Sequence, residues 1–426
     1  MPPRETATPS LVRAINVRAT FDLLRARGPL GASQIVRESG LSRPTVGEVL
    51  GQLLGAGLIR RVGRSRGLPG PTAQLYGVEP RAGWVLGLDI GREWVRATLS
   101  DLNGTVAAHT ASRTSTSAVA VIDQLRRAAD QLAGAAEITL ANIDQVVVGT
   151  PGVILSGEDH FSLAPNLPGW ESPQVISGIR EALVAPVVFE NDINLAAVGE
   201  HVHGVARGVD DFVLLSVGTG VGMGVVVDGE LRRGAAGLAG EVAYLRLDLD
   251  CPAQPGAVAW GKGAFESLTN SAALLALARD AGLTEVRSVA DLFAAARSGG
   301  AEAQSIVELE ARRLAHAIAA IAAVLDPGLV VLGGGVGSGG GDLLLGPTAA
   351  ALASISPFSP RLAVSSLGAE AVIAGAGAIG LRLALDRIFG RVSSFGGGPE
   401  PARAAAPDVS AGEHGRRVAG WVPARR

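Results

Sequence analysis

The sequence predicts an α/β protein in which an N-terminal winged helix-turn-helix precedes a two-lobed body. Residues 31–60 have the pattern of a helix, a tight turn and a second helix. From Trp84 onward, short apolar strands alternate with helical segments in two similar rounds. The expected division is a winged helix domain at 1–81, lobe 1 at 82–200 with a returning helix at about 372–390, lobe 2 at 201–371, and a disordered tail at 391–426.

The second helix of the pair carries clear start signals. Ser42 is placed to cap it, Pro44 lies in its first turn, and Leu41 can pack against Val46. Apolar side chains then recur on one face, at Val46, Val49, Leu50, Leu53 and Leu54. The remaining positions are free for solvent or DNA, and the candidate DNA contacts are Ser42, Arg43, Thr45, Glu48 and Gln52.

Charge is unevenly distributed along the chain. Residues 1–81 contain twelve arginines, no lysine and five acidic residues, a net charge of +7, whereas the rest carries −10 of the total of −3. Neutralised phosphates supply much of the affinity of proteins for DNA, so a basic module on an acidic body indicates a nucleic-acid partner. A merely solvated basic face is the alternative.

The flanking segments complete the winged helix. Residues 10–27 form a first helix whose packing side is expected to carry Leu11, Ile15, Phe21, Leu23 and Leu24. Residues 58–78 have the pattern of a two-stranded hairpin around a loop rich in glycine and proline. Its arginines could contact phosphates or the minor groove, or form a solvated charge cluster, and they are Arg60, Arg61, Arg64 and Arg66.

Cysteine content and hydropathy point to the cytoplasm. The single cysteine, Cys251, excludes an internal disulfide and any zinc site built from several cysteines. No charged and then apolar leader opens the chain, and the longest apolar run, near 315–325, is shorter than the ~20 residues of a membrane span. We therefore expect a cytoplasmic protein with no membrane association.

The body repeats one plan twice. Three antiparallel strands are expected from Trp84, then a helix at about 118–136, a strand at 145–152, a further helix, and a strand that ends at Asp192. A glycine-broken hairpin at 212–231 opens the second round, which also contains an apolar strand running into glycines 333–335. Two lobes facing each other across a cleft follow from this repetition.

Two glycine segments are candidate nucleotide contacts. Gly218, Thr219 and Gly220 lie where one strand turns into the next, so bare backbone amides there can approach a phosphate. A simple tight turn is the alternative. Gly334 could let an adenine or a ribose lie against the backbone, and a helix-entry loop is an equally open interpretation.

A polar triplet marks the predicted cleft. Glu190, Asn191 and Asp192 follow an apolar strand, which would point three polar groups into the cleft. An aspartate there can accept a hydroxyl proton during phosphoryl transfer, and the amide can hydrogen-bond a polyol. Alternatively, Asp192 and Asn194 simply cap the helix that follows.

Residues 84 to about 390 resemble the ROK family of sugar kinases and repressors, which has the actin-like two-lobe fold. The shared segments are DIG at 89–91, GTPG at 149–152, NLPGW at 166–170, ENDINLAAVGE at 190–200, VGTGVGMGVVVDG at 217–229, GLAGEV at 237–242, and the strand with its glycines at 330–335. The first 80 residues resemble the winged helix of the family's repressor members.

The resemblance implies roles for individual residues. The implied sugar site consists of Gly152, Asn166, Asn191, Asp192, Glu241, Tyr244 and Glu266. In a kinase, Asp192 would be the catalytic base. The implied nucleotide contacts, vestigial or weak in this chain, are Gly218, Thr219, Gly220 and Gly334.

The chain departs from the family kinases at two places. Arg92 and Glu93 replace a glycine and a threonine that receive ATP phosphates, and a carboxylate beside a polyphosphate is repulsive. In the family, a histidine and three cysteines hold a structural zinc, whereas here Tyr244 stands in the histidine position and only Cys251 remains. We expect no metal and no resident cofactor, with ATP and Mg only if kinase activity persists.

The leading hypothesis is a sugar-responsive transcriptional repressor without enzymatic activity. Its expected partners are operator DNA, a small sugar effector and a second copy of the chain, in a homodimer or a dimer of dimers. Two alternatives remain open: an active ATP-dependent sugar kinase that also binds DNA, and a dimerisation scaffold that has lost its ligand. The scaffold is suggested by Tyr244 in place of histidine.

Overall fold

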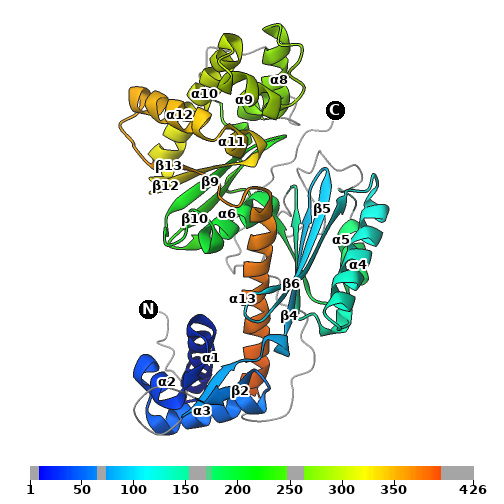
Figure 1. Cartoon of the computed structure of the whole chain (residues 1–426), viewed down its shortest axis with the longest axis vertical. Coiled ribbons are helices and arrows are strands. Elements are labelled where there is room, and N and C mark those ends of the chain that lie inside the picture. Colours follow the sequence, from blue (N-terminus) through cyan, green and yellow to red (C-terminus); the bar gives the residue numbers. More distant parts are fainter. Residues whose placement is uncertain are drawn as a thin grey trace, which may run out of the picture.

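The computed structural model describes residues 9–64, 73–152, 170, 172, 174–246 and 263–394. Figure 1 shows a small helical domain at one end, a sheet with flanking helices in the middle, and a second sheet with its helices at the other end. One long helix, α13 (Ala371–Ser394), runs from the middle of the molecule to the small domain. The architecture is therefore a winged helix followed by a two-lobed α/β body, as predicted.

The small domain is a winged helix-turn-helix. Its elements are α1 (Pro9–Arg27), β1 (Leu30–Gly31), α2 (Ala32–Ser39), α3 (Arg43–Gly55), β2 (Ile59–Arg64) and β3 (Gln74–Val78). The strands pair in the order β1-β3-β2, with β2 and β3 forming the antiparallel wing. Ser42 caps α3 as predicted, because its Oγ accepts a hydrogen bond from the Thr45 amide at 3.3 Å. Val46 and Leu53 are fully buried beneath this helix.

The predicted packing face of α1 is wrong in its first turns. Leu11 and Ile15 are 50% and 56% exposed, whereas Phe21 and Leu24 are buried. The helix packs on its neighbours through the C-terminal half that carries Val17, Phe21 and Leu24. Its first turns extend beyond this cluster, so the apolar side chains there lie at the surface.

Lobe 1 contains a five-stranded sheet in the order β6-β5-β4-β7-β8. Its strands are β4 (Trp84–Ile90), β5 (Trp94–Asp101), β6 (Val106–Arg113), β7 (Gln145–Thr150) and β8 (Val187–Asn191). The first three are antiparallel, as predicted, and β7 and β8 continue the sheet in parallel to β4. Helices α4 (Ala118–Ala135) and α5 (Gln174–Leu183) cover one face, while Val147 of β7 packs against α13 on the other.

Lobe 2 repeats this plan in the order β11-β10-β9-β12-β13. The strands are β9 (Phe212–Val217), β10 (Val221–Val227), β11 (Glu230–Leu231), β12 (Leu329–Gly333) and β13 (Arg361–Val364). Its helices are α7 (Ala264–Thr269), α8 (Ser271–Asp280), α9 (Val289–Arg297), α10 (Ala301–Leu325), α11 (Gly334–Gly340) and α12 (Asp342–Ile355). An antiparallel hairpin joined to parallel strands recurs in both sheets, which confirms the predicted repetition.

Two helices cross where the lobes meet, α6 (Asp192–His203) and α13. A Cβ atom on Gly199 would lie 2.2 Å from the carbonyl oxygen of Ala371, and one on Gly375 would lie 1.9 Å from that of Leu195. Only glycine allows two helix backbones to approach so closely. The neighbouring Glu200 is buried, and its carboxylate accepts hydrogen bonds from the Ser365 hydroxyl and the Leu367 amide.

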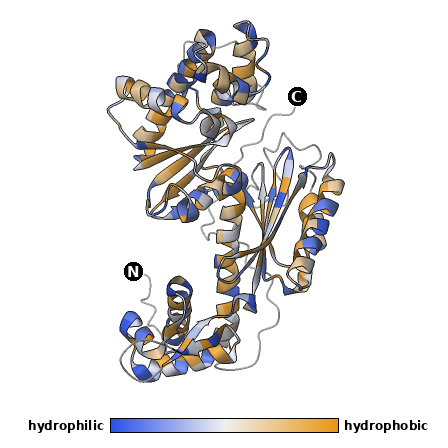
Figure 2. Cartoon of the chain, viewed as in Figure 1, coloured by the Kyte–Doolittle hydropathy of each residue, from blue (hydrophilic) through white to orange (hydrophobic). Residues whose placement is uncertain are grey.

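A segment other than the apolar run predicted near 315–325 comes nearer to a membrane span in length and composition. The segment Gly368–Gly390, largely α13, is long and apolar enough by composition to cross a membrane, and 44% of its most apolar window is buried in the protein. Figure 2 shows hydrophobic residues along this helix, which packs on β4, β7 and α6 in the manner of a core helix. It continues to Ser394, past the boundary expected at 391, and the rest of the predicted tail lies outside the described residues.

Candidate functional site

The candidate sugar site starts where β8 ends and α6 begins. Asn191 caps α6, since its Oδ1 accepts hydrogen bonds from the amides of Ile193 at 2.9 Å and Asn194 at 3.2 Å. Its Nδ2 donates to the carbonyl oxygen of Gly152 at 3.2 Å. The structure thus brings Gly152, Asn191 and Asp192 together. The alternative that Asp192 and Asn194 cap the helix is wrong, because Asn191 occupies that position.

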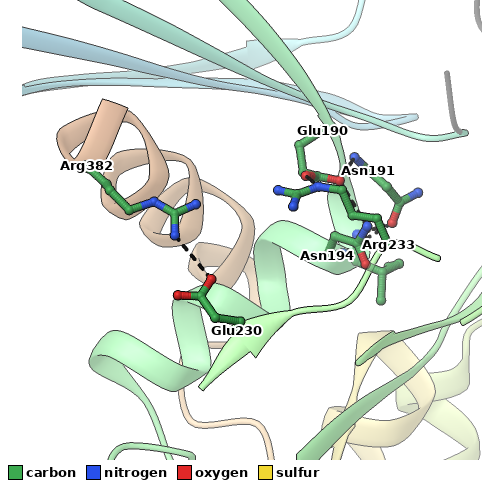
Figure 3. A network of polar contacts seen from close by, with 7 residues as sticks. Glu190, Asn191, Asn194, Glu230, Arg233 and Arg382 are labelled. Carbon is green, nitrogen blue, oxygen red and sulfur yellow. Dashed lines mark hydrogen bonds and ion pairs between the residues drawn. The ribbon is translucent and has the colours of Figure 1, made fainter. Parts of the chain in front are cut away.

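The carboxylate of Glu190 is almost buried and is engaged by protein groups, whereas the triplet was predicted to point three polar groups into the cleft. Its Oε1 accepts hydrogen bonds from the Asn191 amide at 3.0 Å and from Asn194 Nδ2 at 2.9 Å. Its Oε2 forms an ion pair with Arg233 Nε of lobe 2 at 2.6 Å (Figure 3). Glu190 therefore orients the segment that carries Asn191 and Asp192. Arg233 was not identified from the sequence, where no motif marks it.

Asp192 lies near other carboxylates, Asp89 of lobe 1 and Glu241 of lobe 2. Removal from water, then the charge of Asp89 and more weakly that of Glu241, raise the pKa of Asp192 to about 7, although the Ile193 amide opposes the shift. The residue keeps partial surface exposure, but the protein around its carboxylate excludes most of the solvent. At neutral pH this group can therefore accept or release a proton, which suits contact with a sugar hydroxyl.

Asp89 has a cationic partner that the sequence did not reveal. It is buried, and Arg96 Nη1 on the adjacent strand lies 3.2 Å from its Oδ2. Burial raises the pKa of Asp89 to about 6, while the charge of Arg96 and its hydrogen bond act in the opposite direction. The guanidinium of Arg96 thus partly neutralises the Asp89 carboxylate.

Lobe 2 contributes Glu241, Tyr244 and Glu266. Gly240 adopts φ +91°, and a Cβ there would lie 1.8 Å from the Met223 carbonyl oxygen, so glycine lets the loop before Glu241 rest on β10. Burial and then the charge of Glu266 raise the pKa of Glu241. Burial, Glu241 and Glu266 raise the pKa of Tyr244. The charge of Glu241 also contributes to the raised pKa of Asp192, so carboxylates of the two lobes lie close enough to influence each other.

Two residues implied by the resemblance cannot be placed. Asn166 and Cys251 lie outside the described residues. Trp170, from the same motif as Asn166, is described and is 1% exposed in the core of lobe 1. Among the described residues, no group of three or more His, Cys, Asp or Glu is arranged to hold a metal ion.

The first turn of lobe 1 is closed by contacts of its own. The amide of Gly91 donates to the carbonyl oxygen of Trp94 at 2.9 Å, and the Thr114 hydroxyl donates to that of Gly91 at 2.7 Å. Glu93 pairs with Arg113 at 3.2 Å, and the Arg113 guanidinium lies 4.6 Å from the centre of the Trp94 indole. The turn thus carries an exposed carboxylate, which would repel a polyphosphate.

The second glycine turn is built as predicted. A Cβ on Gly218 would lie 3.3 Å from the Gly335 amide nitrogen, so the turn between β9 and β10 lies against the start of α11, where Gly334 is the first residue. The Gly218 amide donates to the Gly220 carbonyl oxygen at 2.9 Å. Val221, the next amide after the turn, donates to Glu266 Oε2 at 3.1 Å. The turn therefore connects the candidate nucleotide contacts with Glu266 of the candidate sugar site.

The candidate DNA surface combines α3 with the wing. Arg43 and Glu48 are exposed, whereas Thr45 and Gln52 are half-buried. Glu48 Oε1 lies 3.5 Å from Arg13 Nε, and Ser42 Oγ lies 2.8 Å from Thr45 Oγ1. These two contacts fix the side chains at the start of the recognition helix.

On the wing, three of the predicted arginines are described and exposed: Arg60, Arg61 and Arg64. Arg60 pairs with Glu79 at 3.3 Å, so part of its charge is neutralised within the domain. Arg66 lies outside the described residues. Strand β2 of the wing therefore adds exposed cationic side chains to the candidate DNA surface of α3.

Known proteins match both parts of the chain. Residues 85–381 match the sequence profile of the ROK family, and residues 10–63 match that of the IclR helix-turn-helix domain. The xylose repressor of Bacillus subtilis is 24% identical over 262 residues, which are 58% of this chain and 64% of that protein. A glucokinase of Halalkalibacterium halodurans is 32% identical over 251 residues, 54% of this chain and 74% of that protein. The chain thus spans slightly less than two thirds of the repressor's length.

Solved structures give the same picture of the fold. A ROK family transcriptional regulator, a homologue of the E. coli MLC protein, superposes with a TM-score of 0.73 at 22% identity, covering 90% of this chain and 100% of that chain. A ROK glucokinase from Streptomyces griseus, in complex with glucose and AMPPNP, superposes with a TM-score of 0.58 at 27% identity, covering 70% and 100%. Because the family match covers well over half of its length, this chain belongs to the ROK family and has an IclR-type helix-turn-helix domain at its N-terminus.

Proposed function

We propose that this chain is a sugar-responsive transcriptional repressor. The observation that carries the proposal is the continuous core between the winged helix and the body. Phe21 and Leu24 of α1 belong to the same apolar cluster as Leu385, Ile388 and Phe389 of α13. Helix α13 also packs on the sheet that ends at the candidate sugar site. A movement of the lobes on sugar binding would therefore be transmitted through α13 to the DNA-binding domain. Xylose repressors among the relatives support this proposal.

The ligand in this proposal is a sugar held by hydroxyl contacts. Asn191 and Asp192 of lobe 1 would meet it from one side, and Glu241 and Glu266 of lobe 2 from the other. D-xylose and D-glucose are the first candidates, since relatives are named for them. No resident metal or cofactor is expected, because Tyr244, whose pKa is raised, stays a neutral phenol and makes a poor zinc ligand.

The DNA partner in this proposal is an operator bound by two copies of the chain in the cytoplasm, as a homodimer or a dimer of dimers. A sugar that favours one arrangement of the lobes changes the spacing or orientation of the paired winged helices. By linkage, the factor by which the sugar changes operator affinity equals the factor by which the operator changes sugar affinity.

A selection and titration with the full chain test the proposal. DNA duplexes selected from a random pool should bind the protein in fluorescence anisotropy, with an affinity that D-xylose, D-glucose or N-acetylglucosamine changes. A sugar at 100 times its Kd should also stabilise the protein by ~2.7 kcal/mol, which a scaffold without a ligand site would not show. Absence of DNA binding at low salt would refute the repressor.

The recognition helix can be tested separately. Arg43→Ala should weaken binding of the selected duplex by ~1–3 kcal/mol if this exposed side chain reads a base, or lower the salt slope by ~1 if it contacts a phosphate. Arg126→Ala is the matched control, because Arg126 is an exposed arginine on α4 of lobe 1. Equal binding by both variants would argue against docking through α3.

A sugar kinase that also binds DNA is the second candidate. It is favoured by the pKa of Asp192, raised to about 7, because a base poised near neutrality suits proton transfer from a sugar hydroxyl. The closed first turn with Glu93 argues against it. The kinase predicts sugar-dependent release of ADP from ATP and Mg that Asp192→Asn abolishes. No turnover across a hexose and hexosamine panel would eliminate this candidate.

A further inference from the structure

Two ion pairs connect the lobes at the two ends of one short segment, residues 230–233. At one end, Glu230 Oε2 lies 3.3 Å from Arg382 Nη1 on α13. At the other end, Arg233 Nε lies 2.6 Å from Glu190 Oε2 at the end of β8. Figure 3 shows both contacts, one at α13 and one beside Asn191 and Asn194. Since α13 and β8 both pack in lobe 1, this segment of lobe 2 is attached to lobe 1 twice.

The segment itself moves with lobe 2. Its strand β11 forms the edge of the lobe 2 sheet and pairs with β10 alone. Arg232, between the two ion-paired residues, bonds back to its own hairpin through the Val227 carbonyl oxygen at 3.0 Å and Asp228 Oδ2 at 3.1 Å. A rotation of lobe 2 would therefore displace the whole segment relative to lobe 1.

The cleft end of the segment touches the candidate sugar site. Glu190 uses its second oxygen to hold Asn191 and Asn194, so displacement of Arg233 changes the environment of the residues that would bind the sugar. The Glu190 side chain is 8% exposed and that of Arg233 is 43% exposed, so the ion pair is shielded from solvent on the Glu190 side alone. Its N–O distance of 2.6 Å is shorter than the 3.3 Å at the other end of the segment.

The other end of the segment leads to the DNA-binding domain. Arg382 lies one helical turn before Asp386 on α13, and Asp386 Oδ1 lies 2.9 Å from Arg18 Nη1 on α1. The Arg382 and Glu230 side chains are 51% and 65% exposed, so this pair contributes little to stability and can be exchanged without unfolding the protein.

We propose that residues 230–233 form an interlobe latch, which couples closure of the cleft to the position of α13 and so to the winged helix. The segment is suited to this role because Arg233 at one end pairs with Glu190, and Glu230 at the other end pairs with Arg382 on α13, the helix on which the winged helix packs. The regulatory part of the inference rests on the proposed function, whereas the mechanical part does not.

Spin-label distance measurements test the mechanical part without sugar or DNA. Labels are placed on Val106→Cys of lobe 1 and Val324→Cys of lobe 2, which are 52% and 81% exposed, in a Cys251→Ala background. Arg382→Glu places two carboxylates side by side, and Glu230→Arg places two guanidinium groups side by side. Because like charges repel, each variant should broaden or lengthen the interlobe distance distribution. The exchanged pair Glu230→Arg with Arg382→Glu should restore it.

A matched ion pair away from the lobe junction supplies the control. Arg126 Nε lies 2.9 Å from Asp130 Oδ2 on α4, with side chains 48% and 52% exposed. Arg126→Glu should leave the distance distribution unchanged. If Arg382→Glu and Glu230→Arg behave like this control, the latch is refuted.

Operator titrations test the regulatory part. The ratio of operator Kd with and without saturating D-xylose or D-glucose should change by about threefold or more in Arg382→Glu and return in the exchanged pair. A ratio unmoved by either single variant, in a protein that binds both sugar and DNA, would refute the coupling. If the wild-type protein binds neither, the proposed function fails, while the distance measurements still decide the latch.

Discussion

The guanidinium of Arg18 on α1 lies 2.9 Å from the carboxylate of Asp386 on α13, and it also lies 5.2 Å from the centre of the Phe389 ring. Phe389 packs edge to face against Phe21 at 5.2 Å. One cation thus contacts both the charge and the ring that α13 offers to the winged helix. The winged helix is therefore packed directly on α13 of the body through an ion pair and an aromatic contact.

Phe389→Ala should weaken this junction strongly. The ring is 7% exposed, and removal of a buried phenylalanine side chain typically costs ~3–5 kcal/mol. We expect a separate, lower-temperature unfolding transition of the winged helix in calorimetry, with loss of DNA binding. Phe358→Ala is the control, because that ring is 40% exposed and should cost far less. Similar stability of the two variants would show that α13 does not support the DNA-binding domain.

Ser42→Ala should separate a stability effect from a DNA effect. Ser42 caps α3 and Ser117 caps α4, each accepting a hydrogen bond at 3.3 Å from the amide three residues later. Loss of either cap should cost ~1 kcal/mol in chemical denaturation. Only Ser42→Ala should also weaken binding of the selected duplex, since α4 belongs to lobe 1. Equal DNA binding by both variants would place the recognition surface elsewhere.

The winged helix and the two-lobed plan could be predicted because their signals are local. Ser42, Pro44 and the apolar stripe of α3 lie within a few turns of one another in the sequence. The alternating strand patterns and the glycine turns of the two lobes likewise predict each strand and turn from residues that are close together in the sequence. Such signals depend on propensity and periodicity, which a single sequence displays.

The contacts between distant segments could not be predicted in this way. The pairing of Arg233 with Glu190 joins residues 43 positions apart, and nothing in the local pattern marks it. Leu11 and Ile15 fit the packing stripe of α1, yet they lie outside the apolar cluster that buries Val17, Phe21 and Leu24 and are half exposed. Asp192 was identified as a polar cleft residue, but its raised pKa depends on burial by the folded protein and then on the charge of Asp89, which lies on β4.

Sugar binding should depend on pH through Asp192. The ionised carboxylate is the better acceptor for a sugar hydroxyl, and the pKa of Asp192 is raised to about 7. Affinity measured by calorimetry should therefore increase as the pH rises through about 7 and then level off. Asp192→Asn should bind more weakly and lose this dependence, whereas Asp130→Asn, on the exposed side of α4, should keep it. A pH profile shared by wild type and Asp192→Asn would assign the titration to another group.

Glu310→Gln should stabilise the protein at neutral and alkaline pH. Glu310 is fully buried in lobe 2, neither carboxylate oxygen has a hydrogen-bond partner within the described part of the chain, and burial raises its pKa to about 8 against the opposing charge of Arg313. The unfolded chain releases this proton near pH 4.5, well before the folded protein does. Stability is therefore retained below that pH and lost progressively as the pH rises toward 8.

Glutamine has nearly the same shape and no charge to desolvate. In urea denaturation, Glu310→Gln should exceed the wild type by about 4 kcal/mol at pH 8, and the difference should shrink toward zero near pH 4.5. Glu308→Gln, exposed on the same helix, should show no such trend. A Glu310→Gln difference that stays constant with pH would mean that the carboxyl group is solvated or paired in the folded protein.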